Sequence, residues 1–291
     1  KQKTAYEIPK RDWSSDVCSS DLVANSTGSI TRRIKWKQIA KYEFALPPLD
    51  EQQRIVKLLS SCSRYEGALR QSSAATNAIR ISILKELDES TQERCRLDEI
   101  IDLERGASYK STDYVDVEKG RPFLNLKCVT RQGTFSSSGV KWVRADFEPK
   151  NVVGAGELFF ANTDLTPGRL LVGAPFFFSG LDTREKPCFS MDLTRVRLKT
   201  DALPLELIYH LLNIPRVRSK MRALTGGSTV GHLRLARVPE IEVPVVSDPE
   251  SMLAKLRRLD GISGLVAGVE DDSRGLAVVV RERLLGGSDV H

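Results

Sequence analysis

The sequence has few of the side chains that bind metal ions or cross-link a chain. Its 291 residues include three histidines and five cysteines. Four of the cysteines lie far apart, so they give neither the close spacing of a zinc knuckle nor a disulfide framework; these are Cys62, Cys95, Cys128 and Cys188. We expect these thiols to be reduced and mostly buried, as in a cytoplasmic protein.

Long apolar runs and catalytic motifs are also missing. No apolar run approaches the ~18 residues of a membrane span, and no phosphate-binding Gly-x-x-x-x-Gly-Lys-Ser/Thr loop occurs. The run Gly226-Gly227-Ser228-Thr229-Val230 precedes His232 but lacks the second glycine of a nucleophile elbow. His210, between Tyr209 and Leu211, is predicted to be a core histidine. We predict that the chain is not itself an enzyme and that it holds neither a metal nor a cofactor.

The charge of the chain favours a polyanionic partner. Lysine and arginine number 44 against 38 acidic residues, which gives a net charge of +6, and 41% of the residues are hydrophobic. This composition is typical of a globular protein with a sizeable core. An excess of basic residues is common in proteins that bind nucleic acid, although charge alone does not identify the partner.

The N-terminal segment, residues 1–22, shows no pattern typical of a fold. Lys1 to Ile8 reads as one frame of a library primer, and Asp12 to Leu22 reads as the adjoining adapter. We interpret residues 1–22 as a sequencing artefact in front of a truncated reading frame and exclude them from the fold. The alternative is a natural serine-rich tail.

A weak internal repeat relates residues near the beginning of the remaining chain to residues near its end. Gly28-Ser29 aligns with Gly227-Ser228, Ile34-Lys35-Trp36 with Leu233-Arg234-Leu235, and Tyr42-Glu43-Phe44 with Ile241-Glu242-Val243. The alternation of apolar and polar residues predicts short strands in both copies. Each copy then leads into a helix that begins with an acidic residue, which suits a helix N-terminus.

Two long helices are predicted by heptad repeats of apolar residues. The first, about Asp50 to Glu89, has one seam at Ile55, Cys62, Leu69, Thr76 and Ile83 and a second three residues later at Leu58, Tyr65, Ser72 and Ile79. The second, about Pro249 to Leu285, repeats Met252, Leu259, Val266, Ser273 and Val280, with Ile262, Val269 and Leu276. We expect the two helices to pack on each other. Four glycines in the second helix weaken its helical propensity.

The chain between these helices is predicted to be an α+β domain. From Arg96 to Val246, short apolar strands alternate with glycine and proline, at residues 122–126, 157–161, 170–172 and 175–178. Residues 205–212 and 216–224 have helical periodicity, and Pro215 suits a first helical turn. The predicted fold is therefore a globular mixed α/β domain flanked by two long helices.

One string makes the chain similar to a known family. Leu46-Pro47-Pro48-Leu49-Asp50-Glu51-Gln52-Gln53-Arg54-Ile55 resembles the start of the central conserved helix in specificity subunits of type I restriction-modification systems. Residues 156–162 are similar to a shorter segment of that family. The second copy, residues 245–250, departs from the pattern because it lacks the double proline and the glutamine pair.

The resemblance implies a division of the chain. Residues 23–49 would be the remnant of a first target-recognition domain, 50–92 the central conserved helix, 93–246 a complete second target-recognition domain, and 247–291 the C-terminal conserved helix. The resemblance also implies that the two long helices form an antiparallel coiled coil, which in the family holds two recognition domains apart and sets the spacing between two half-sites.

The resemblance also implies a function. The chain would bind double-stranded DNA sequence-specifically, read one half of a bipartite target, and dock a modification (methyltransferase) subunit and a restriction (endonuclease and translocase) subunit. S-adenosylmethionine, ATP and Mg would belong to those partner subunits. Self-association of the truncated form, which would rebuild a two-fold reader, is a further hypothesis.

The candidate DNA-binding residues fall into two sets. The first is a basic segment and the glycine-containing loop after it, in which arginine and lysine would contact phosphates: Arg216, Arg218, Lys220, Arg222, Gly227, Ser228, Thr229 and His232. The second contains polar side chains able to contact base edges: Tyr109, Lys110, Asn125, Lys127, Asn162 and Arg169. The alternative for the loop is an ordinary connection with a solvated charged face.

Two other functions stay open. The chain could be a fragment of a single-chain restriction enzyme or methyltransferase whose catalytic part is missing. It could also be a helical interaction module that does not touch DNA, which salt-insensitive binding to a protein would favour.

Overall fold

The computed structural model describes residues 36–40, 48–130, 133–144, 147–165, 168–199, 203–227 and 230–285; the side chains at 38, 39, 267, 270–274 and 276–285 are not among those described. The predicted artefact and most of the predicted remnant at 23–49 lie outside these ranges. The chain packs as two units. The larger comprises residues 77–260, and the smaller comprises residues 1–76 with 261–291.

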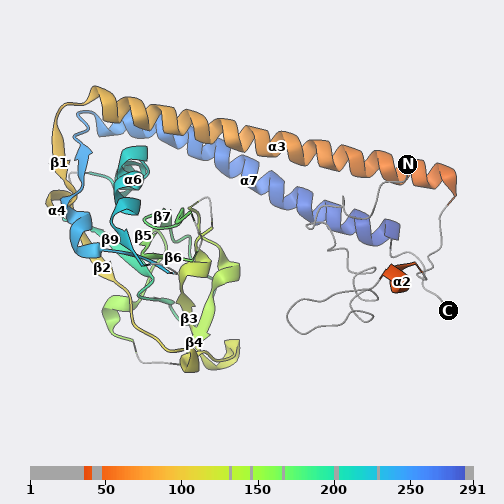
Figure 1. The fold of residues 1–291 in the computed structure, drawn as a ribbon, viewed down its shortest axis with the longest axis horizontal. Coiled ribbons are helices and arrows are strands. Elements are labelled where there is room, and N and C mark those ends of the chain that lie inside the picture. The colour runs from red at the N-terminus through yellow and green to blue at the C-terminus, as the bar shows by residue number, and fades with distance from the viewer. Residues whose placement is uncertain are drawn as a thin grey trace. The chain divides into compact units, whose positions relative to one another are not determined.

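Both predicted long helices are present (Figure 1). Helix α3 spans Leu49–Ser90 and α7 spans Pro249–Leu285, so both agree with the predicted bounds to within a residue. The glycines of α7 do not interrupt the helix. No helix among the described residues is long and apolar enough to cross a membrane.

The predicted seam of α3 is half right. All members of the first set are partly or fully buried, but the set three residues later is exposed, with Leu58 at 41%, Tyr65 at 50% and Ile79 at 52%. The shielded stripe continues four residues after most first-set positions instead, as at Leu59 and Leu87, although Ser73 is exposed. A straight helix has 3.6 residues per turn, so positions i and i+4 follow one stripe as readily as i and i+3.

The α7 seam is also incomplete. Met252, Leu259, Val266 and Val269 are partly or fully buried, whereas Ile262 is 46% exposed. Ser273, Leu276 and Val280 lie outside the described side chains. The antiparallel coiled coil therefore stays a prediction.

The centre of the larger unit is a four-stranded antiparallel sheet in the order β2-β9-β5-β7. Its strands are β2 (Ile101–Arg105), β9 (Leu193–Leu198), β5 (Leu158–Ala161) and β7 (Pro175–Phe177). Along β5, Leu158 and Phe160 enter one core while Phe159 and Ala161 enter another. Because β5 is covered on both faces, its sequence is continuously apolar rather than alternating.

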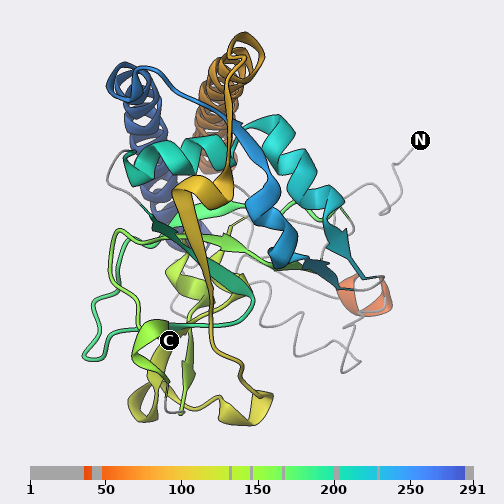
Figure 2. The ribbon, with the colours of Figure 1, turned by 90° about the vertical axis from the view of Figure 1, so that its left-hand side faces the viewer.

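Helices cover one face of this sheet (Figure 2). Helix α5 (Leu205–Leu212) and helix α6 (Pro215–Ala223) match the predicted helical pair, and Pro215 opens α6. They share a core with Leu84 of α3 and Leu253 of α7, both within the larger unit. His210 is 1% exposed, so the prediction of a core histidine is confirmed.

A second core, rich in phenylalanine, lies against the other face, and three smaller sheets surround the centre. They are β4-β3-β8 (Lys141–Val143, Arg121–Leu124, Cys188–Phe189), β10-β11-β6 (Thr225–Gly226, Gly231–Leu233, Thr163–Asp164) and β1-β12 (Arg94–Arg96, Glu242–Pro244). Short helix α4 (Leu97–Ile100) follows β1. The 3-10 turns are η2 (Ser111–Asp113), η3 (Val117–Lys119), η4 (Leu126–Cys128), η5 (Ser137–Gly139), η6 (Pro149–Asn151) and η7 (Leu235–Glu240).

Two strand predictions are wrong. Residues 170–172 form no strand and contribute only a single bridge between Val172 and Ala161. In the repeat, Trp36–Ile39 forms helix α2, and the aligned residues in the second copy lie in η7 rather than in a strand. Pro239 within η7 cannot donate a backbone hydrogen bond to a ladder, which disfavours a strand there. Tyr42 to Phe44 lie outside the described residues.

The two ends of the polypeptide that forms the sheets meet in one short ladder. Strand β1 pairs with β12, with Arg94 opposite Pro244 and Cys95 opposite Val243. The Val245 amide donates to the Glu93 carbonyl at 3.1 Å, which extends the contact toward the helices. The polypeptide from residue 94 to residue 244 therefore begins and ends at one place within the larger unit.

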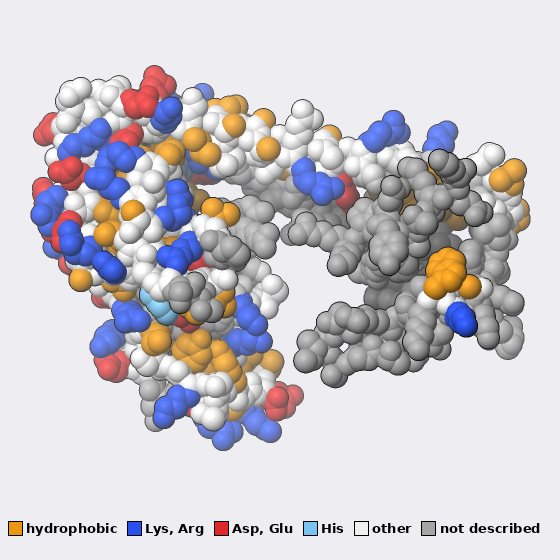
Figure 3. All heavy atoms as spheres, in the orientation of Figure 1, with side chains coloured by type: hydrophobic (Ala, Val, Ile, Leu, Met, Phe, Trp, Pro, Cys, Tyr) orange, Lys and Arg blue, Asp and Glu red, His pale blue; other side chains and the backbone are white. Residues whose placement is uncertain are grey.

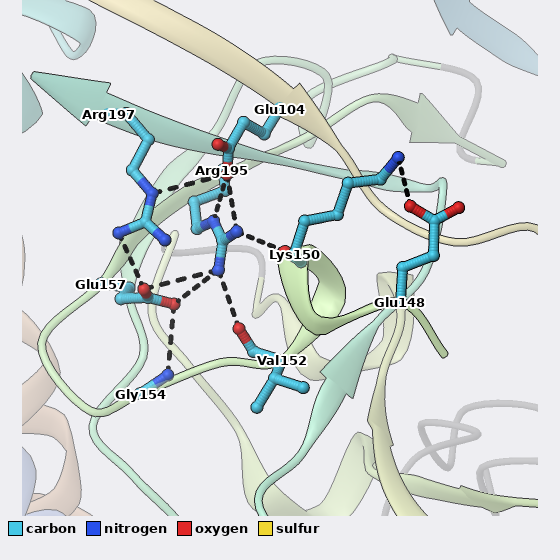
Figure 4. Close-up of polar contacts among 8 residues, drawn as sticks. All are labelled: Glu104, Glu148, Lys150, Val152, Gly154, Glu157, Arg195 and Arg197. Carbon is cyan, nitrogen blue, oxygen red and sulfur yellow. Dashed lines mark hydrogen bonds and ion pairs between the residues drawn. The ribbon is translucent and has the colours of Figure 1, made fainter. Parts of the chain in front are cut away.

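A buried arginine on β9 connects β2, β9 and the loop that precedes β5 in the larger unit (Figure 4). Arg195 of β9 is 1% exposed, and its guanidinium lies 2.6 Å from Glu104 of β2 and 3.2 Å from Glu157, which precedes β5. It also donates to the carbonyls of Val152, at 2.9 Å, and Lys150. These partners satisfy a charge that would otherwise be costly to bury.

Arg195 and its neighbour Arg197 allow a controlled test of this network. Arg197 pairs with the same two carboxylates, but its side chain is 45% exposed. Because removing one member of a buried ion pair leaves an unpaired charge, we expect Arg195→Met to lower the free energy of unfolding in urea by about 3–5 kcal/mol. Arg197→Met should cost at most about 1 kcal/mol. Equal losses in the two variants would contradict the role given to Arg195.

Candidate nucleic-acid interface

The predicted glycine-containing loop lies between β10 and β11 of the larger unit. Gly227 has φ +106°, and a Cβ there would come within 2.1 Å of the Val230 carbonyl oxygen, so only glycine fits this turn. Ser228 and Thr229 lie outside the described residues. His232 is exposed and lies opposite both Gly226 and Thr163 in the β10-β11-β6 sheet.

Arg169 braces this loop from a neighbouring segment. Its guanidinium donates to the carbonyl of Thr225 at 3.2 Å and to that of Gly227. Its backbone is left-handed, with φ +47°, which is uncommon for a residue with a side chain. These bonds give Arg169 an intramolecular task, and a contact with DNA stays a prediction.

The four basic residues of α6 lie in different surroundings. Arg216 forms two 2.8 Å hydrogen bonds with Asp88 of α3 and one of 3.0 Å with the Glu242 carbonyl. Arg218 donates to the Leu170 carbonyl at 2.8 Å, and burial, with the charge of Arg222, lowers the pKa of Arg218 to about 10. Lys220 is exposed and Arg222 is partly buried. Lys220 is therefore the member most available to a phosphate.

Two predicted base-reading residues are buried and already hydrogen-bonded. The Asn125 side chain donates to the carbonyls of Phe123 and Gly139 and accepts from the Lys127 amide. The Asn162 side chain donates to the Met191 carbonyl at 3.0 Å and accepts from the Thr194 hydroxyl at 2.6 Å. Both asparagines hold backbone segments together, and direct contact with DNA stays untested for them.

The structure brings three predicted residues to one open hollow in the larger unit. Tyr109, Asn125 and Lys127 line it, and its volume is about 1200 Å³. Thr163 and Val230 also line it, so the hollow borders the glycine-containing loop. Lys110 follows Tyr109 and is exposed. We call this feature the aromatic hollow.

Sequence reasoning missed several residues of the aromatic hollow. Tyr114, Lys141, Trp142 and Asp192 line it as well. Tyr114 meets the β4 strand through an isolated bridge to Val143, a pairing that no local pattern in the sequence predicts. A lysine beside a tryptophan at 141–142 was the only local signal, and it is weak.

The backbone beneath the hollow is closely packed. A Cβ on Gly139 would lie 2.1 Å from the Lys127 carbonyl oxygen, so glycine is required where η5 crosses η4. The Asn125 bond to the Gly139 carbonyl, at 3.0 Å, fixes the same crossing. Lys127 therefore projects from a rigid turn.

Comparison with known proteins shows what the chain is similar to. Residues 16–72 match the family described as the type I restriction modification DNA specificity domain. This match begins inside the segment that we interpret as an artefact. Over 280 residues the chain is 19% identical to the type I restriction enzyme MjaVIII specificity subunit of Methanocaldococcus jannaschii, with 86% of this chain and 63% of that subunit covered.

The fold agrees with this match. The crystal structure of the type I restriction-modification system S subunit from M. genitalium has a TM-score of 0.51 and 17% identity, and the alignment covers 91% of this chain and 68% of that chain. The chain therefore shares the fold of this S subunit. The chain is thus similar, in one segment of its sequence and in its fold, to specificity subunits of type I restriction-modification systems.

Asp88 makes the position of α6 sensitive to acid. The hydrogen bond from Arg216 lowers the pKa of Asp88, burial opposes this, and Arg94 at 2.6 Å lowers it further. A depressed carboxyl pKa stabilises the fold above the ordinary value of about 4, and this stabilisation is lost as the pH falls below it.

We therefore expect urea midpoints of the unmutated chain to fall as the pH is lowered below about 4, where the carboxylate is protonated in the unfolded chain before it is protonated in the fold. Asp88→Asn should lower the midpoint at pH 7 and flatten this dependence. Asp102→Asn, which removes an exposed carboxylate 3.4 Å from Lys199, is the matched control and should leave the pH profile unchanged. An unchanged profile in Asp88→Asn would contradict the assignment.

Proposed function

We propose that the chain is the sequence-specificity component of a type I restriction-modification complex. In this proposal, the larger unit binds double-stranded DNA and reads one half of a bipartite target. The observation that carries the proposal is the family match at residues 16–72, which continues into α3. The net charge of +6 supports a polyanionic partner.

The contact with phosphates is assigned to an exposed cation near the glycine-containing loop. Lys220 lies on the last turns of α6, and its side chain is exposed, so it can reach a phosphate without leaving an internal partner. Such contacts release counterions and make affinity fall with salt.

Catalysis is assigned to partner subunits, and the chain itself is proposed to be non-catalytic. A modification subunit would supply S-adenosylmethionine chemistry, and a restriction subunit would supply ATP- and Mg-dependent cleavage. The apolar side chains exposed along α3, Leu58, Tyr65 and Ile79, support docking of a protein on this helix. Exposed apolar groups in a row are typical of interaction surfaces.

The purified full chain should select one sequence pattern from randomised duplex DNA. For a selected duplex, Lys220→Ala should reduce the slope of log affinity against log salt by about 1, because one phosphate contact is lost. Lys255→Ala removes the same charge from an exposed position on α7 and is the matched control. Absence of any enriched pattern, with binding insensitive to salt, would refute the proposal and favour a protein-interaction module.

The chain is also proposed to self-associate. It spans 63% of the length of the M. jannaschii subunit, and the structure describes a single larger unit between two long helices. Two copies would present two such units, as a bipartite palindromic site requires. Sedimentation velocity should show a concentration-dependent dimer that Tyr65→Ser weakens, whereas the control Val117→Ser, exposed in the larger unit, leaves it intact. A monomer at every concentration would exclude this state.

A further inference from the structure

The rim of the aromatic hollow exposes an unusual number of apolar side chains. Tyr114 is 37% exposed, Val117 59% and Leu165 67%, and all three line the hollow. Figure 3 shows a cluster of hydrophobic side chains on this face of the larger unit, with lysine and arginine around it. Single exposed apolar side chains are common on protein surfaces, but a group of them is typical of a surface that binds a partner.

The lining comes from two separate parts of the larger unit. One side is built by residues 109–118 and by the β3-β4 region, and the other by β6 and Val230 next to β11. Figures 1 and 2 both place β3 and β4 at the end of the larger unit away from α5 and α6. The rim therefore includes both residues beside the glycine-containing loop and residues of the β3-β4 region, which lies away from the basic helix α6.

The aromatic side of the hollow is held rigidly. The Tyr109 ring meets Tyr114 at 5.7 Å and Phe123 at 5.1 Å between centroids, both edge to face. The Tyr109 hydroxyl donates to Asp192 at 3.1 Å, and Thr163 donates to the other oxygen of the same carboxylate at 3.2 Å. A rigid rim loses little conformational entropy when it meets a partner, which favours selective contact.

The polar groups of the hollow carry both charges. Lys127 and Lys141 are exposed, and neither ammonium has an ion-pair partner among the residues that the structure describes. Asp116 and Glu118 also line the hollow. Carboxylates repel phosphates, so this mixture does not suit a groove that follows a DNA backbone.

Base edges fit this mixture better than phosphates do. In the major groove, lysine donates to guanine, carboxylates accept from the cytosine amino group, and apolar side chains contact the thymine methyl group. We propose that the rim of the aromatic hollow is the base-reading surface of the larger unit, with Lys141 and Leu165 as specificity-determining residues. This inference rests on the proposed function, because it assigns sequence reading to a place within the same DNA-binding unit.

Leu170, five residues after Leu165, is a matched control for it. Leu170 is 61% exposed, close to the 67% of Leu165, but it does not line the hollow. Randomised duplex DNA is selected with the unmutated full chain and with Leu165→Ala, Lys141→Ala and Leu170→Ala. Leu165→Ala and Lys141→Ala should each relax one position of the selected pattern, whereas Leu170→Ala should select the unmutated pattern.

Replacing thymine by uracil tests the apolar contact directly. Deoxyuridine lacks only the methyl group, so the unmutated chain should bind a selected duplex about fourfold more weakly when the contacted thymine is replaced, as expected for one buried methyl group. Leu165→Ala should show little further loss on the same replacement. Equal losses in both proteins would place the methyl contact elsewhere and overturn the role of Leu165.

The outcomes separate this inference from the proposed function. If the unmutated chain selects no pattern, the proposed function fails and the inference fails with it. If the unmutated chain selects a pattern that Leu165→Ala and Lys141→Ala reproduce in full, the DNA-binding function stands and the base-reading surface lies outside the hollow.

Discussion

The larger unit depends on one charge held away from water. The guanidinium of Arg195 is surrounded by two carboxylates and two backbone carbonyls, and its planar fork allows all four contacts at once. Glu104 lies 91 positions before Arg195 in the sequence, and Lys150 and Glu157 lie 45 and 38 positions before it. The same side chain stacks over the ring of Phe189 at 5.1 Å, so polar and aromatic packing meet at one residue. A core of apolar side chains alone would leave this register less strictly specified.

A series of backbone contacts connects Arg195 to the surface of the larger unit. Arg195 holds the carbonyl of Val152, and Val152 bridges Cys188 of β8, the strand that pairs with β3. Strand β3 in turn pairs with β4, which carries Lys141 and Trp142 at the aromatic hollow. On the helical side, Asp88 performs a comparable task by binding Arg216 of α6 and Arg94 of β1. Two buried ionic anchors thus position the two sides of the proposed interface.

Much of the fold could be predicted because its signals are local. Apolar periodicity predicted α3, α7, α5 and α6, and continuous apolar runs predicted β5 and β7. The second seam of α3 failed because a heptad reading cannot distinguish positions three and four residues along a straight helix. The short helix at Trp36–Ile39 failed because alternation over so few residues fits a helical turn as well as a strand.

The candidate site was harder to predict, because whether a polar side chain is free to contact DNA depends on the tertiary structure around it. Tyr109 and Lys127 meet at the hollow as part of the predicted polar set. Arg216 looks like a free cation in the sequence, yet its partner Asp88 lies 128 positions away. Asn125 and Asn162 are polar residues whose hydrogen bonds are already made inside the fold. Tyr114 and Trp142 escaped notice because only strand pairing brings them to one rim.

The ladder between β1 and β12 has a consequence for how such a chain can change. Because Arg94 lies opposite Pro244, everything between them is spliced into the chain at one point, with a helix on either side. Replacing that insert changes the polypeptide at one seam and leaves the sequence of both helices as it was. A recombination event with both ends at this ladder would therefore exchange residues 94–244 as a whole and keep the helix on either side of them in the sequence.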